Sequence, residues 1–131
     1  MDKCGSGGSG GDIDGVKKMI HKFGPKQVGN AKYGSYSRTC LHYAASWGHP
    51  NIITLLIENG VEIDPKTDYG ETPLRVAIIN RKYSSITTLI KLGADLEKAE
   101  VARWNQSHFD SSMREEKTKA AIAEGQRLAG I

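Results

Sequence analysis

Acid–base or metal chemistry in this 131-residue chain would fall first to its four histidines, His21, His42, His49 and His108. His108 lies near Ser107 and Asp110, but a catalytic set needs a mutual geometry that spacing along the chain does not supply. The chain has no His-Glu-x-x-His, no Cys-x-x-Cys and no glycine-rich phosphate loop before a helix. The sequence therefore predicts a protein that is not an enzyme and that uses no cofactor, metal or small-molecule substrate.

The two cysteines, Cys4 and Cys40, are too few for a disulfide framework or a metal site. Cys40 stands at a predicted helix start, where we expect a buried free thiol that packs as a small apolar group. No apolar signal segment opens the chain, and no apolar run is long enough to span a membrane. These features predict an intracellular protein, cytoplasmic or nuclear, without membrane insertion.

The elements that would position these residues follow a repeat. The pattern Thr-Cys-Leu-His-Tyr-Ala-Ala opens at Thr39, and Thr-Pro-Leu-Arg-Val-Ala-Ile opens 33 residues later at Thr72. The glycines that close the two copies, Gly60 and Gly93, are again 33 residues apart. Two landmarks with one period indicate a stacked repeat array. A hydrophobic content of 38% suits such an array, because each repeat buries only a thin layer against its neighbours.

These motifs resemble those of the ankyrin repeat family over residues 34–99. The first copy meets the family's Thr-Pro-Leu-His-x-Ala except at Cys40, which replaces proline, and Gly48-His49 matches the start of the family's second helix. The second copy departs from the family at Arg75, which replaces histidine, and at Arg81-Lys82, which replaces Gly-His. The resemblance implies an all-α helix–turn–helix solenoid with turn or hairpin tips, in which His42 and His49 hydrogen-bond the turns between repeats.

The pattern divides the chain into a leader, an array over residues 12–99 and a C-terminal unit. In order, the parts are a flexible Gly/Ser-rich leader or linker (1–11), a partial repeat (12–33), two full repeats (34–66 and 67–99) and a degenerate unit with a C-terminal helix (100–131). The helix of the partial repeat begins after the N-cap Asp12 and stops at Gly24. Because Gly24 to Gly60 exceeds the period by three residues, we expect a longer loop over 25–34.

Within the full repeats, the spacing predicts helices over 40–47, 50–59 and 84–92. The last of these contains Ser84, Ser85, Thr87 and Thr88, which are weak helix formers, so we expect the second repeat to be the less stable one. Beyond residue 99, Ser112 and Glu115 form a capping-box pattern before a charged helix with a thin apolar stripe. That helix either caps the array or docks on a partner or a neighbouring domain.

The resemblance also implies a concave surface whose exposed positions bind a partner. Transferred position by position, the candidate partner-binding residues are Tyr36, Arg38, Trp47, Tyr69, Glu71 and Asn80. Tyr, Trp and Arg often dominate binding energy, which favours four of the six. Two structural alternatives stand beside this: Trp47 packs over the edge of the N-terminal repeat, and Tyr36 stacks on Tyr69. Trp104 follows at a similar position in the degenerate unit, where packing under the C-terminal helix is favoured over ligand contact.

Three functional hypotheses follow. The first is a non-enzymatic adaptor or scaffold module that binds a protein or peptide on its concave face. The alternative is a regulatory or structural ankyrin domain of a larger enzyme or channel. Nucleic-acid binding is the weakest, because the basic run from Lys17 to Lys32 is interleaved with a single aromatic residue, Phe23. Residues 12–38 carry six Lys or Arg against two Asp, which suits either an acidic partner or a solvated face. Self-association through the array ends stays open.

Overall fold

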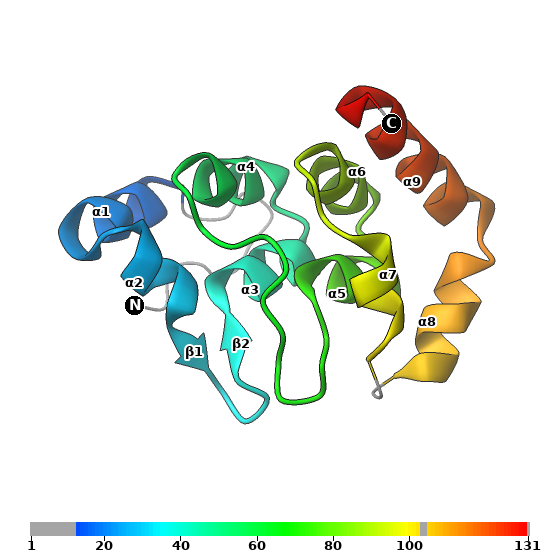
Figure 1. Cartoon of the computed structure of the whole chain (residues 1–131), viewed down its shortest axis with the longest axis horizontal. Helices are drawn as coiled ribbons and strands as arrows, with labels where there is room; N and C mark the ends of the chain where they lie inside the picture. Colours follow the sequence, from blue (N-terminus) through cyan, green and yellow to red (C-terminus); the bar gives the residue numbers. More distant parts are fainter. Residues whose placement is uncertain (1–12, 103–104, 131) are drawn as a thin grey trace.

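The computed structural model describes residues 13–102 and 105–130, and within them the chain forms two rows of helices (Figure 1). One row holds α1, α4, α6 and α9, and the other holds α2, α3, α5 and α8. The elements are α1 (Ile13–Phe23), α2 (Pro25–Asn30), β1 (Lys32–Tyr33), β2 (Arg38–Thr39), α3 (Cys40–Trp47), α4 (Pro50–Glu58), α5 (Pro73–Ile79), α6 (Tyr83–Lys91), α7 (Leu96–Glu100), α8 (Gln106–Met113) and α9 (Glu116–Ala129). The all-α prediction is confirmed.

The N-terminal unit contains one more helix than the sequence predicts. Helix α1 buries Val16, Met19 and Ile20, and the chain then turns at Gly24 with a φ of +85°. The loop expected over 25–34 is wrong, because Pro25 begins helix α2. Proline suits a first helical turn, where its missing N–H costs nothing. Tight packing also holds α2, since a Cβ added at Gly29 would lie 2.8 Å from Val61 Cγ1.

Strands β1 and β2 form the tip that precedes the first full repeat. They pair antiparallel, with Lys32 opposite Thr39 and Tyr33 opposite Arg38. The next tip closes differently, by a hydrogen bond from the Thr67 amide to the Glu71 carbonyl at 3.0 Å. The two tips are joined because the Asp68 amide donates to the Tyr36 carbonyl at 3.1 Å. This contact fixes one repeat's tip against the next.

The first full repeat forms the helices that its pattern predicts. Helix α3 has the predicted bounds, and α4 ends one residue earlier than predicted. The Thr39 hydroxyl caps α3 by accepting from the His42 amide at 3.4 Å, and Gly48 ends it with a φ of +77°. Cys40 is fully buried but disulfide-bonded, so the prediction of a free thiol is wrong. Spacing along the chain cannot show whether Cys40 forms a disulfide, because the bond needs a specific geometry that only folding creates.

The second full repeat packs its helices on those of the first. Helix α6 is one residue out of register with its predicted range. Its weak helix formers are compensated by tertiary packing, which normally supplies most helical stability. The fully buried apolar side chains of the two repeats form one continuous core: Leu41, Ile52, Ile53, Leu56, Leu74, Ile78, Ile86 and Leu89. Burying these eight side chains is the main driving force for stacking the two repeats.

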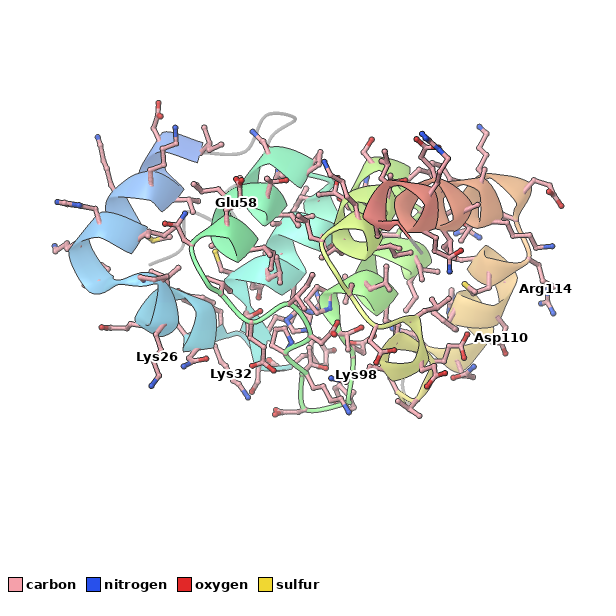
Figure 2. All side chains as sticks on the ribbon, turned by 45° about the horizontal axis from the view of Figure 1, so that its top comes forward. Lys26, Lys32, Glu58, Lys98, Asp110 and Arg114 are labelled. Carbon is pink, nitrogen blue, oxygen red and sulfur yellow. The ribbon has the colours of Figure 1, made fainter. Side chains whose placement is uncertain are left out.

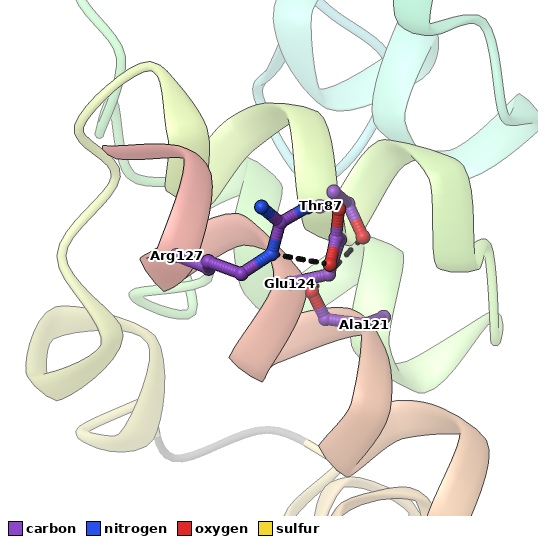
Figure 3. A network of polar contacts seen from close by, with 4 residues as sticks. All are labelled: Thr87, Ala121, Glu124 and Arg127. Atoms are coloured by element: carbon purple, nitrogen blue, oxygen red, sulfur yellow. Dashed lines mark hydrogen bonds and ion pairs between the residues drawn. The ribbon is translucent and has the colours of Figure 1, made fainter. Parts of the chain in front are cut away.

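Helix α9 covers the outer face of α6. Gly125 makes the closest approach, since an added Cβ would lie 2.8 Å from both Ile90 Cβ and the Thr87 carbonyl oxygen. The Thr87 hydroxyl also donates to the Ala121 carbonyl at 2.9 Å, and Arg127 pairs with Glu124 on the helix itself (Figure 3). In this structure the helix therefore packs on the end of the array, and docking of α9 on a partner or a neighbouring domain stays a prediction.

The expected capping box before α9 is wrong. Ser112 lies inside α8, where its hydroxyl is buried with no hydrogen-bond partner among the described residues. Glu115 instead directs its carboxylate at the second repeat, accepting from Arg81 Nε and, at 3.1 Å, from the Tyr83 hydroxyl. The pattern misled because α8 uses Ser112 as a helical residue. The leader 1–11, Asp12 and Trp104 lie outside the described residues.

Candidate functional site

Two aromatic side chains meet at the tips of the array. The rings of Tyr36 and Tyr69 lie 5.3 Å apart between centroids and are tilted by 52°. Each stays partly open to solvent, with exposed fractions of 40% and 38%. The predicted stacking is confirmed, and it does not remove the pair from solvent. A pair held in this way loses little rotamer freedom when a partner covers it.

Arg38 lies beside this pair, on β2 just before α3. Its guanidinium carbon lies 5.6 Å from the centroid of the Tyr36 ring, a distance typical of a cation–π contact. The residue is half-buried, and its Nε is enclosed without a hydrogen-bond partner among the described residues. An enclosed N–H without an acceptor is costly, so this Nε lowers the stability of the tip, and its burial closes it to a partner's atoms.

Trp47 lies at the other end of α3 and is the most exposed aromatic side chain of the described residues, at 51%. It borders a hollow of about 250 Å³ together with Lys82, Tyr83 and Ser84. Trp47 thus lies beside the turn of the second repeat. The alternative in which Trp47 packs over the edge of the N-terminal repeat stays a prediction.

Asn80 occupies the matching place at the end of α5 and is exposed. Its side-chain amide donates to the Val76 carbonyl at 2.9 Å and approaches the Ser46 hydroxyl at 3.5 Å. It thus connects the C-terminal ends of α3 and α5. Its carbonyl oxygen has no recorded protein donor among the described residues, which leaves an acceptor at this end of the surface.

Glu71 is not a surface residue, so the prediction that it is exposed is wrong. Its exposed fraction is 2%, and its amide donates to the Thr67 hydroxyl at 3.2 Å. Its carbonyl oxygen accepts from His42 Nε2 at 2.7 Å. The position lies at the base of the second tip, where the preceding repeat covers it. Burial disfavours the charged form of Arg75 and lowers its pKa, and the negative charge of Glu71 opposes this shift.

His42 performs the structural role that its motif implies. Its Nε2 donates to the Glu71 carbonyl, so Nδ1 carries the lone pair that accepts from the Thr39 amide at 3.1 Å. Burial is the main reason why the pKa of His42 falls to about 4. His49 differs: burial lowers its pKa too, but its Nε2 has no hydrogen-bond partner in the described part of the chain. The turn-bridging prediction therefore holds for His42 and is wrong for His49 Nε2.

Arg75 is a key residue whose role sequence reasoning missed. It is fully buried, and its guanidinium donates to the Ala99 carbonyl at 2.7 Å and to the Gln106 side chain at 3.2 Å. The same group lies 4.3 Å from the centroid of the Phe109 ring. Its departure from the expected histidine was the available signal. Arg75 ties the second repeat to α7 and α8, and burial lowers its pKa.

Searches for other kinds of site end without a candidate in the described residues. Across 13–102 and 105–130, no three His, Cys, Asp or Glu side chains gather closely enough to hold a metal ion. None of the helices within these ranges combines the length and the apolar character that crossing a membrane requires.

Comparison with known proteins decides the family. Residues 7–100 match the sequence family described as ankyrin repeats, in three copies. The chain belongs to the ankyrin repeat family. The match starts before the first full repeat and so includes the partial unit that contains α1 and α2. Ankyrin repeats are generally protein–protein interaction modules and are typically not catalytic.

Its similar proteins are long and varied. A probable E3 ubiquitin-protein ligase of Oryza sativa is 29% identical over 90 residues, which cover 69% of this chain and 18% of the relative. Serine/threonine-protein kinase 12 of Arabidopsis thaliana is 35% identical over 85 residues, covering 64% and 17%. A putative ankyrin repeat protein of Rickettsia bellii is 42% identical over 59 residues, covering 44% and 25%. The ankyrin chain thus spans a quarter or less of these relatives.

Proposed function

We propose that this ankyrin array binds a partner protein or peptide on a concave-face surface made of Tyr36, Arg38, Trp47, Tyr69 and Asn80, and that it serves as an adaptor or scaffold. The supporting observation is the exposure of three large aromatic side chains, two at the tips and one at the end of α3. Large aromatic side chains left open to solvent are costly for a monomer and are typical anchors of protein interfaces.

The surface is also preorganised. The tyrosine pair is fixed by ring contact and by the hydrogen bond between the two tips. Asn80 is held by Val76 at the other end. A rigid surface avoids the ordering cost that a flexible one would pay on binding. The guanidinium of Arg38, 5.6 Å from the centroid of the Tyr36 ring, adds a positive charge beside the tyrosine pair.

The test compares wild type with a Trp47→Ala/Tyr69→Ala variant in affinity capture followed by cross-linking mass spectrometry. Partners retained by wild type should be lost, with a fall in affinity of about tenfold or more, because both side chains are interface anchors. The matched control is Phe23→Ala/Leu128→Ala, which removes two comparably exposed apolar groups (37% and 46%) outside the surface. Circular dichroism checks that all three chains fold. Equal capture by wild type and the double variant contradicts the proposal.

The relatives' lengths favour one second candidate, a regulatory or structural ankyrin domain within a larger enzyme or channel. An antibody raised against the chain would separate the two on a blot of native extract. A band near 14.3 kDa supports the independent adaptor. A much larger band supports the second candidate and moves the partner search to the neighbouring domains.

A further inference from the structure

Three lysines, one from each of three successive units, surround a hollow of about 460 Å³. Lys32 ends the N-terminal unit on β1, Lys66 begins the second tip, and Lys98 lies on α7. Lys32 and Lys98 appear along one edge of the array in Figure 2, together with Lys26. We call this feature the lysine hollow; its lining also includes Glu62 and Asp64.

The positive charges of the lysine hollow are not neutralised by ion pairs. Among the ion pairs of residues 13–102 and 105–130, none involves Lys32, Lys66 or Lys98. Asp64 is occupied by another contact, since its Oδ2 accepts from the Asp95 amide at 3.2 Å. Burial raises the pKa of Asp64, although Lys98 opposes this shift. The three lysines thus share the lining of the lysine hollow with the exposed Glu62 and the hydrogen-bonded Asp64, and the charge of Asp95 also acts on Asp64.

A second hollow adjoins the first at Lys66. It has a volume of about 410 Å³ and is bordered by Lys66, Tyr69 and Val101. Val101 is exposed at 68%, the highest value among the large apolar residues that the structure describes. We call this the tip hollow. Lys66 lines both hollows, so they lie side by side along the tips. The tip hollow has a mixed lining, in which Tyr69 and Val101 are the apolar part and Asp68 adds one carboxylate.

We propose that the array recognises an extended acidic segment of its partner, with an apolar side chain in the tip hollow and carboxylates at the lysine hollow. The inference rests on the proposed function, because Tyr69 belongs to both surfaces. Charge complementarity carries it: unpaired ammonium groups attract carboxylates and raise association rates. A nucleic acid fits less well, because Glu62 and Asp64 would repel a continuous phosphate backbone, whereas discrete carboxylates can be spaced to avoid them.

The experiment uses a random peptide display library selected on the whole chain. Retained peptides should carry Asp or Glu within a few residues of an apolar side chain. Titration calorimetry then compares wild type with Lys66→Gln/Lys98→Gln. The double variant should lose affinity by about tenfold, and added salt should weaken wild-type binding. Lys26→Gln is the matched control, because Lys26 shares the edge but does not line the hollow.

Three results would overturn the inference. In the first, the retained peptides are not enriched in Asp or Glu, and they bind the lysine variant but not Tyr69→Ala. This result would support the proposed function and contradict recognition of an acidic segment. No retained peptide at all would count against both. Binding of a thymidine oligonucleotide as tight as that of the best peptide, with the same dependence on Lys66 and Lys98, would show a general polyanion site instead.

Discussion

His42 and Arg75 hold the same position in successive repeats, and each joins its helix to a distant backbone carbonyl through a different side-chain group. Each buried side chain donates to its distant carbonyl at 2.7 Å. The imidazole reaches Glu71 at the base of the next repeat's tip, whereas the guanidinium reaches Ala99 on α7, at the end of its own repeat. The longer side chain also needs more partners, because a buried charge is costly unless it is paired and hydrogen-bonded.

The turns after these inner helices differ in a related way. Gly48 ends α3 with a φ of +77°, a conformation that glycine adopts without strain. The equivalent residue after α5 is Arg81, which is held at a φ of +55°. Its side chain pairs with Glu115 and so links the second repeat to the cap. The first repeat is thus locally relaxed, while the second depends on the C-terminal unit that covers it.

The largest expected effect is the loss of the Arg75 bridge. Arg75→Ala should lower the free energy of unfolding by about 4 kcal/mol, because it leaves a cavity and an unsatisfied Ala99 carbonyl. Urea denaturation measures this free energy. The control is Arg114→Ala, which removes an exposed arginine from the C-terminal unit that Arg75 contacts (Figure 2). Arg75→His should lower the free energy of unfolding nearly as much, because an imidazole is too short to reach the Ala99 carbonyl. Wild-type stability of Arg75→His would show that the two positions are interchangeable.

The next effect is a pH dependence confined to the first repeat. The folded pKa of His42, about 4, lies below the unfolded value of 6.5, so the unfolded chain takes up the proton first. The contribution of neutral His42 to the free energy of unfolding is therefore fully present above the unfolded pKa. It is lost as the pH drops from 6.5 towards 4, which lowers the free energy of unfolding by up to about 3 kcal/mol. Protonated Nδ1 would also face the Thr39 amide with two donors opposed.

Hydrogen exchange between about pH 7 and about pH 5 can localise that loss. Protection should fall around α3 first, while α5 follows only with global unfolding, because Arg75 stays charged throughout this range. His49 contributes with the same sign, since burial lowers its pKa as well. A His42→Gln variant isolates the effect. Its stability should depend less on pH, and an unchanged pH profile would remove His42 as the cause.

The smallest effect concerns the turn at Arg81. Arg81→Gly restores the residue type of the first repeat and should raise the free energy of unfolding by about 0.5 kcal/mol, as relief of the left-handed backbone exceeds the added freedom of the unfolded chain. Thermal unfolding is the measurement. Glu115→Gln is the control that removes the ion pair and keeps the backbone. A loss of stability in Arg81→Gly as large as in Glu115→Gln would mean that the ion pair outweighs the strain.

Much of the array follows from the sequence, and the failures share one cause. The period places α3, α4 and α6 within a residue, because helix-forming patterns and glycine stops act over a few neighbours. Helix α2 was missed because its packing against Val61, far along the chain, offsets a weak local pattern. The expected capping box failed because Glu115 finds better partners in Arg81 and Tyr83, more than thirty residues away.

The candidate site was also predicted in part. The positions within the repeat identified Tyr36, Trp47, Tyr69 and Asn80 as exposed, and all four are. The prediction from repeat positions was wrong for Glu71, which the preceding repeat buries. Arg75 could be noticed as a departure from the motif, but its partners could not be named. The role of the four exposed residues in binding stays a prediction.

By itself, the sequence determined the repeat, its period, the two-helix unit and the family, because these depend on residues within a few turns of one another. The tertiary structure alone decided which side chains the stack encloses and which partners they reach. His42, Arg75 and Glu115 each bond to groups from 24 to 34 residues distant. Such contacts form only when separate units pack, so spacing along the chain cannot specify them.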